Sequence, residues 1–215
     1  MHVNVGNGKI TQISIRDLST DTNFMDYVTK CNNQLDKTSR ARCHAGDNGY
    51  MYTYGFHNIK LGDYKSMKDD NNLTREYCIE MKRVLNEHFP DVIKNIITEE
   101  RKQGLMPNEN MGGQYGISSS CIISEDLVNS PHFDLDISHG VSIFNESIPG
   151  KAKDWNFLLP NVMKDNDGNR GIAIRLFHGC CISWDGHEIY HCTGLRDKGN
   201  ENHVYGNFFG AKQVN

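Results

Sequence analysis

The chain has 215 residues, of which 23% are charged and 37% hydrophobic, and its formal net charge is −4 at pH 7. This composition excludes a disordered chain and is typical of one globular domain, which we expect to span residues 1–215. A protein that binds nucleic acid through its overall charge would be basic, so any contact with nucleic acid would come from a local site.

The chain contains seven cysteines, and no two of them have the CxxC spacing of a structural zinc site. We expect free, buried thiols in a reducing compartment. The first residues lack the apolar segment of a signal peptide, and no run approaches the ~18 apolar residues that a membrane helix needs. These features favour an intracellular protein, of the cytoplasm or nucleus, that is neither secreted nor embedded in a membrane.

Residues 1–70 carry the weakest signals, and we expect outer strands and a lid there. Weak alternation over residues 9–18 predicts one or two short strands, and residues 24–35 predict a short helix. Alternating aromatic residues over 50–56 predict a further strand. These aromatic side chains would pack within a sheet or, alternatively, form a wall on which a substrate stacks.

Residues 71–104 carry the clearest helical pattern. Asn71 and Asn72 are candidate N-caps, and apolar residues recur at helical spacing from Leu73 onward. Pro90 suits the first position of a second helix, and Gly104 suits its end. We expect both helices to buttress one face of a sheet without a chemical role.

After residue 104 the pattern changes from helices to short strands. A loop rich in Pro, Asn and Gly covers residues 106–116, and Asp185-Gly186 predicts a two-residue hairpin turn further on. Helices followed by strands predict an α+β fold, with a barrel or jelly roll over residues 115–210 buttressed by the N-terminal helices. The predicted strands are 117–123, 133–137, 140–144, 155–159, 171–177, 180–184, 187–192 and 203–209.

The segment from Ser130 to Asp136 places ligand-type side chains at alternate positions. Residues two apart in a strand point the same way, so His132 and Asp134 would present an imidazole and a carboxylate together. With one more histidine from a distant strand they would form the triad that holds Fe(II) and leaves positions open for an organic co-substrate and O2. The spacing alone fits equally well a histidine hydrogen-bonded to an aspartate without metal.

Three histidines compete to be the third ligand. His191 lies on the predicted strand after the Asp-Gly turn, and His187 shares its face if that strand is regular. His178 comes just before another turn. Because His178 and His187 are expected at exposed hairpin ends, we favour His191.

The segments PHFDLDISHGVSIF, DWNFLLPNV, GIAIRLFHG and ISWDGHEIYHCT resemble the catalytic core of the 2-oxoglutarate/Fe(II)-dependent dioxygenase superfamily. Within it, residues 115–210 are most similar to TET/JBP-related enzymes of algae, protists and viruses. This resemblance implies a double-stranded β-helix (a jelly-roll, cupin-like fold) with His132, Asp134 and His191 as the iron ligands. It also implies DNA modification at 5-methylpyrimidines, and the group includes an algal enzyme that uses ascorbate in place of 2-oxoglutarate.

The sequence departs from the superfamily at the position that would receive the co-substrate. The superfamily supplies an Arg or Lys, ten or more residues after the second histidine, to pair with the far carboxylate of 2-oxoglutarate, yet residues 201–209 contain neither. Arg175 is the first substitute because it lies within a predicted strand, and Arg196 is the second. His203 occupies nearly the expected position. The superfamily favours 2-oxoglutarate, and ascorbate is the competitor.

Two further residues could act at the site. Asp136 shares a strand face with the ligands, so it could orient a ligand, contact substrate or simply lie in solvent at a strand end. Asn156 could hydrogen-bond a co-substrate or a base. Its neighbours Trp155 and Phe157, and also Trp184, are expected to be core residues.

These features together predict a non-haem Fe(II) dioxygenase that hydroxylates a C–H bond with O2 and an organic co-substrate. The 5-methyl group of a pyrimidine base in nucleic acid is the expected target, and a base in a duplex would have to be flipped out. Alternatives are a free nucleotide, a protein residue as in prolyl-hydroxylase-like enzymes, or a small molecule. A metal-free β-helix module that binds a ligand without turnover is the alternative outside enzymes.

Overall fold

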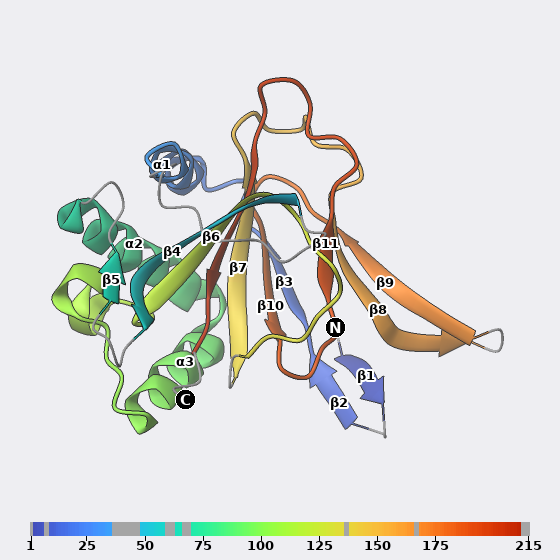
Figure 1. Ribbon diagram of the computed structural model, residues 1–215, viewed down its shortest axis with the longest axis horizontal. Coiled ribbons are helices and arrows are strands. Elements are labelled where there is room, and N and C mark those ends of the chain that lie inside the picture. Colours follow the sequence, from blue (N-terminus) through green and yellow to red (C-terminus); the bar gives the residue numbers. More distant parts are fainter. Residues whose placement is uncertain are drawn as a thin grey trace.

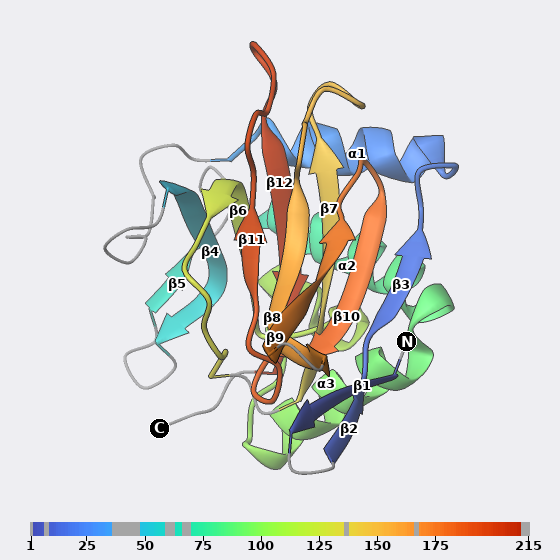
Figure 2. The same ribbon diagram turned by 90° about the vertical axis from the view of Figure 1, so that its right-hand side faces the viewer.

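A computed structural model of the chain describes residues 2–6, 9–35, 48–58, 63–65, 70–135, 138–165 and 168–211. The described chain forms three layers, with helices on one face of a large sheet and a small sheet on its other face (Figure 1). Seen from the side, the small sheet lies in front of the large one (Figure 2). This arrangement leaves two interfaces for core packing, one on each face of the large sheet.

The helices of the helical layer begin at capping aspartates or at a proline. The Asp21 carboxylate accepts the Phe24 N–H at 3.1 Å, and Asp70 Oδ1 accepts two backbone N–H groups at 2.9 and 3.0 Å. The predicted N-caps, Asn71 and Asn72, are therefore wrong, whereas Pro90 begins a helix as predicted. The helices are α1 (Thr22–Asn32), α2 (Asn71–His88), α3 (Pro90–Lys102) and the short η2 (Glu109–Met111) and η3 (Gly113–Tyr115). Within the described residues, no helix is both long and apolar enough to cross a membrane.

The large sheet has the strand order β3-β10-β7-β12-β6-β4-β5 and is antiparallel throughout. Its helix-facing side carries one core, to which Tyr52 and Tyr54 contribute fully buried rings. For these two aromatics the interpretation as sheet packing is confirmed. The strands are β3 (Ser14–Asp17), β4 (Asn48–Asn58), β5 (Asp63–Lys65), β6 (Ser120–Val128), β7 (His139–Glu146), β10 (Cys180–Asp185) and β12 (Val204–Phe209).

The small sheet has the order β11-β8-β9, and residues 129–134 run beside β11 and the residues just before it. From β6 onward the chain passes back and forth between the two sheets, with β8 and β9 as a hairpin within the small one, which is the winding of a jelly roll. The predicted α+β, jelly-roll fold class is confirmed, although the two sheets do not close into a barrel. The strands are β8 (Asn156–Asp165), β9 (Gly168–Arg175) and β11 (Cys192–Gly194), with a separate hairpin of β1 (His2–Gly6) and β2 (Lys9–Gln12).

Two predicted strands are not formed by the described residues, apart from Cys192 at the end of one of them. Over 133–137, the described residues 133–135 are not strand, and only His132 forms an isolated bridge, to His191. In 187–192 the chain instead turns, with Ile189 N donating to Asp185 O at 2.9 Å. The predicted two-residue hairpin at Asp185-Gly186 is wrong because the chain crosses here from the large sheet to the small one.

A second core fills the space between the two sheets. It gathers aromatic rings from both, with Phe144 of β7 packing against Trp155 and Phe157 at centroid distances of 5.8 and 6.4 Å. Trp184 of β10 lies 4.8 Å from Phe157. These rings form the layer on which the candidate site rests.

Candidate metal centre

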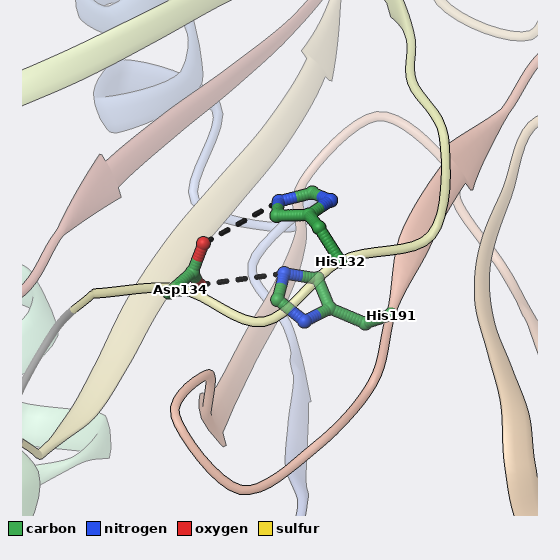
Figure 3. A group of neighbouring side chains, drawn as sticks. All are labelled: His132, Asp134 and His191. Carbon is green, nitrogen blue, oxygen red and sulfur yellow. Dashed lines mark ion pairs between the residues drawn. The ribbon is translucent and has the colours of Figure 1, made fainter.

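The structure brings His132, Asp134 and His191 together at the crossing between the sheets (Figure 3). His132 and His191 exchange backbone hydrogen bonds, His132 N to His191 O at 2.9 Å and His191 N to His132 O at 3.0 Å. Asp134 N donates to Gly186 O at 2.9 Å. Backbone pairing, rather than a continuous strand, therefore fixes the three side chains relative to one another.

The ligand-type atoms of the three side chains converge. The Asp134 carboxylate lies to one side of the two rings and faces both, with Oδ1 3.4 Å from His132 Nε2 and Oδ2 3.4 Å from His191 Nε2. One atom from each residue lies within 4.8 Å of the others. The spacing places two nitrogens and one oxygen around a common point.

Both imidazoles have their proton position fixed by backbone carbonyl groups. His132 Nδ1 lies 2.9 Å from Ser130 O, and His191 Nδ1 lies 2.8 Å from Ile189 O. A carbonyl oxygen only accepts, so each Nδ1 carries the hydrogen and each Nε2 has its lone pair turned toward Asp134. This is the second contact that a metal-ligating histidine usually makes.

The three side chains differ in exposure. The His191 side chain is 5% exposed, against 40% for His132 and 22% for Asp134. Burial lowers the pKa of His191, and the attraction of Asp134 and the hydrogen bond to Ile189 O oppose this lowering. A neutral imidazole is the form that binds a metal, and the centre opens to solvent on the side of His132.

These residues fit a divalent transition metal. Two imidazoles with one carboxylate are the donor set of non-haem Fe(II) centres. A Cβ at position 186 would overlap Asp134 Oδ2, so the carboxylate sits in a space that only a glycine leaves free. His178 and His187 are not part of the group: His178 Nδ1 lies 3.0 Å from Glu146 O, and His187 is exposed at the turn.

The structure does not bring Asn156 and Arg175, two of the predicted site residues, to the centre. The two residues pair across β8 and β9 and so share one face of the small sheet. The next residue, Phe157, points to the other face, where its ring centroid lies 5.3 Å from that of His191. Asn156 and the exposed Arg175 therefore point away from the centre, because successive residues of a strand face opposite sides.

Arg196 and His203 are engaged with aspartates elsewhere. Arg196 pairs with Asp154 at 3.1 Å beside an open hollow. His203 Nδ1 lies 2.8 Å from Asp126 Oδ2, which Lys198 also binds at 2.6 Å. Neither side chain is brought to the three metal-type ligands. Asp136 lies outside the described residues, so its expected role stays a prediction.

One residue near the centre has no counterpart among the predicted site residues. Asn129 Oδ1 accepts the N–H and the hydroxyl of Thr193 at 2.7 and 3.1 Å, and Asn129 Nδ2 lies 3.5 Å from His132 Nδ1. The side chain thus joins the segment that carries His132 to the strand that follows His191. No local pattern marks this asparagine, since its partner is far along the chain.

Comparison with known proteins gives similarity at the level of the fold. No protein-family model matches the chain, and no curated protein matches it. Among solved structures, a prolyl-4-hydroxylase from Pseudomonas putida is similar over 94% of both chains, with 9% identity and a TM-score of 0.51. OsALKBH1 matches 91% of this chain and 96% of its own, at 10% identity and a TM-score of 0.43. The α-ketoglutarate-dependent epimerase SnoN of nogalamycin biosynthesis matches 95% of this chain and 81% of its own, at 9% identity and a TM-score of 0.48.

Proposed function

We propose that this protein is a non-haem Fe(II) dioxygenase that hydroxylates a C–H bond with O2 and an organic co-substrate. The observation that carries the proposal is the group of His132, Asp134 and His191, with both Nε2 atoms 3.4 Å from the Asp134 carboxylate. The fold shared with a prolyl-4-hydroxylase supports it, because that enzyme hydroxylates.

Each ligand has a distinct task. Fe(II) held there would supply the activation of O2. Asp134 offsets one positive charge of the ion, and the two neutral histidines leave the other uncompensated. His191 and the rings of Phe157 and Trp184 keep water away from one side, and the partly exposed His132 leaves the other side open to substrate.

The co-substrate that we propose is 2-oxoglutarate, with ascorbate as the competitor. An organic acid chelated to the metal also needs a hydrogen-bond donor for its remaining oxygens. Arg175, Arg196 and His203 are the cationic or titratable side chains that the sequence offers for this purpose, and none of them faces the centre. Binding of both acids therefore has to be measured side by side.

The substrate that we propose is the 5-methyl group of a pyrimidine base in nucleic acid. The resemblance of residues 115–210 to TET/JBP-related enzymes supports this choice. A prolyl residue in a protein is the second candidate, which the likeness to the Pseudomonas putida enzyme favours. Two substrates are tested separately: DNA that contains 5-methylcytosine, and a proline-rich peptide. Each is incubated with the protein, Fe(II) and one of the two acids. Mass spectrometry then shows which substrate gains the roughly 16 Da of a hydroxylated product.

The metal and co-substrate are tested by anaerobic titration of the purified protein with Fe(II) in the presence of 2-oxoglutarate. We expect the weak visible absorption band of an Fe(II)–2-oxoacid chelate, absent in His132→Ala and retained in His187→Ala, which removes an exposed histidine at the neighbouring turn. Iron binding without the band would favour ascorbate. Absence of iron binding would exclude the proposed enzyme and favour a ligand-binding module.

A further inference from the structure

A buried hydrogen-bond donor beside the centre lacks an acceptor within the described part of the chain. Trp184 Nε1 is buried and has no hydrogen-bond partner among the residues that the structure describes. An indole N–H can only donate, and buried donors are almost always paired. An oxygen acceptor brought by a ligand beside the centre would satisfy this donor.

The indole lies against the most buried ligand of the centre. Its ring meets His191 edge-on, with the centroids 5.3 Å apart and an interplanar angle of 66°. Phe157 and Phe208 pack on it at centroid distances of 4.8 and 5.3 Å. Phe208 keeps partial exposure whereas Phe157 is buried, so Phe208 is the ring with room to move when a ligand enters beside His191.

The side chains that the sequence analysis considered for this task lie elsewhere. Arg175 is on the outer face of β9, Arg196 pairs with Asp154, and His203 bonds Asp126. The donor that β10 presents between the sheets is the neutral indole. A neutral N–H can donate to a single oxygen acceptor, so the ligand does not need a second carboxylate at a fixed distance from the first.

We propose that Trp184 is a co-substrate-binding residue, whose indole N–H donates to an oxygen of the small organic anion bound beside the metal. The inference rests on the proposed function, since it needs a metal at His132, Asp134 and His191. The same donor serves a carboxylate oxygen of 2-oxoglutarate or an enediol oxygen of ascorbate. Trp184 would thus bind the co-substrate in the role that the sequence analysis assigned to Arg175, Arg196 or His203.

The test compares the two tryptophans of the chain. Trp155 is also buried, at 2% exposure against 5% for Trp184, so Trp155→Phe is the matched control for Trp184→Phe. Calorimetry of each anaerobic, Fe(II)-loaded protein is run with 2-oxoglutarate and with ascorbate. For Trp184→Phe we expect about tenfold weaker binding of the co-substrate, equal to about 1.4 kcal/mol, with Fe(II) affinity unchanged within twofold. Trp155→Phe should bind the co-substrate as the wild type does.

A second measurement does not depend on the folding of Trp184→Phe. In Trp155→Phe, Trp184 is the single indole, and its fluorescence emission should shift to longer wavelength when the co-substrate is added to the Fe(II)-loaded protein. Three results would each overturn the inference but not the proposed function. They are an unshifted emission, equal losses of co-substrate affinity in both variants, and wild-type co-substrate affinity in Trp184→Phe. Iron binding without binding of either acid would also overturn it and leave the metal centre standing. Failure of the wild type to bind iron would remove the proposed function and the inference together.

Discussion

Gly186 leaves the space that the Asp134 carboxylate fills. A Cβ on Gly186 would overlap Asp134 Oδ2 and would lie close to its Cβ. We predict that Gly186→Ala displaces the carboxylate and weakens Fe(II) binding about 10- to 100-fold, the range seen when the supports of a metal ligand are lost. Anaerobic Fe(II) titration measures the effect. Gly194→Ala, whose Cβ would meet the flexible end of Leu158 at 3.2 Å, is the control and should bind Fe(II) normally.

Asn129 ties the segment that carries His132 to the strand that follows His191. Because its Oδ1 accepts two hydrogen bonds from Thr193, Asn129→Ala should loosen the segment of His132 relative to that of His191. We predict Fe(II) affinity about tenfold lower, measured by the same titration. Asn129→Asp keeps the accepting oxygen and should recover most of the affinity. Equal losses in the two variants would contradict a role for the Thr193 bonds.

Asp126 makes stability depend on pH. Burial opposes ionisation of this carboxyl, but hydrogen bonds from Lys198, Val204 N and His203 outweigh burial, so its pKa lies below the usual 3.8. A carboxyl with a lowered folded-state pKa contributes stability above its unfolded-state pKa, and that contribution is lost as pH falls through the folded-state pKa.

We therefore predict that Asp126→Asn lowers the free energy of unfolding by about 1.5 kcal/mol at neutral pH, the size of a hydrogen bond to a charged group. Denaturant unfolding between pH 7 and pH 2 should show the difference from the wild type shrinking below pH 3.8. A difference that stays constant over this range would contradict the assignment.

At the scale of elements, one buried carboxylate fastens helix α3 to the start of β6. Glu100 is 1% exposed, and its oxygens accept Ser119 N at 2.8 Å and Ser119 Oγ at 3.0 Å. Because Glu100→Ala leaves these buried donors without that acceptor, we predict a loss of about 2 to 3 kcal/mol in the free energy of unfolding.

Chemical denaturation measures this loss against a neighbouring surface variant. Glu99→Ala removes a carboxylate that pairs with Lys102 at 2.7 Å on the exposed side of the helix. Exposed pairs contribute about 0 to 1 kcal/mol, so Glu99→Ala should stay close to the wild type. Similar losses in both variants would show that the bonds to Ser119 do not fasten α3.

At the scale of the whole molecule, the centre links two parts of the chain that lie far apart in sequence. A metal held by His132, Asp134 and His191 would bind the folded protein and not the unfolded one. At a free concentration 100 times its Kd it should stabilise the fold by about 2.7 kcal/mol. We predict a metal-dependent rise in melting temperature that Asp134→Asn abolishes and Asp154→Asn, at an exposed carboxylate, retains. A rise of equal size in both variants would place the metal elsewhere.

Strand β7, His139–Glu146, extends beyond the predicted strand 140–144 at both ends, and its burial explains why the sequence does not mark those ends. It lies between β10 and β12 in the large sheet, with helices on one face and the small sheet on the other. All its residues except His139 are buried, including the polar Ser142 and Asn145. A strand buried on both faces lacks the polar and apolar alternation that marks a strand with one face in water.

The sequence by itself predicted the helices, the positions of most strands along the chain and, with the resemblance, the three side chains that converge. Pro90, the helical spacing after Leu73 and the His-x-Asp spacing are local signals, because they depend on neighbours along the chain. The tertiary structure decided three features. The two sheets do not close into a barrel, Arg175 and Asn156 point away from the centre, and the ring of Trp184 packs against that of His191. Which face of a strand meets the site depends on the sheet that the strand joins, and that pairing is made by residues distant in sequence.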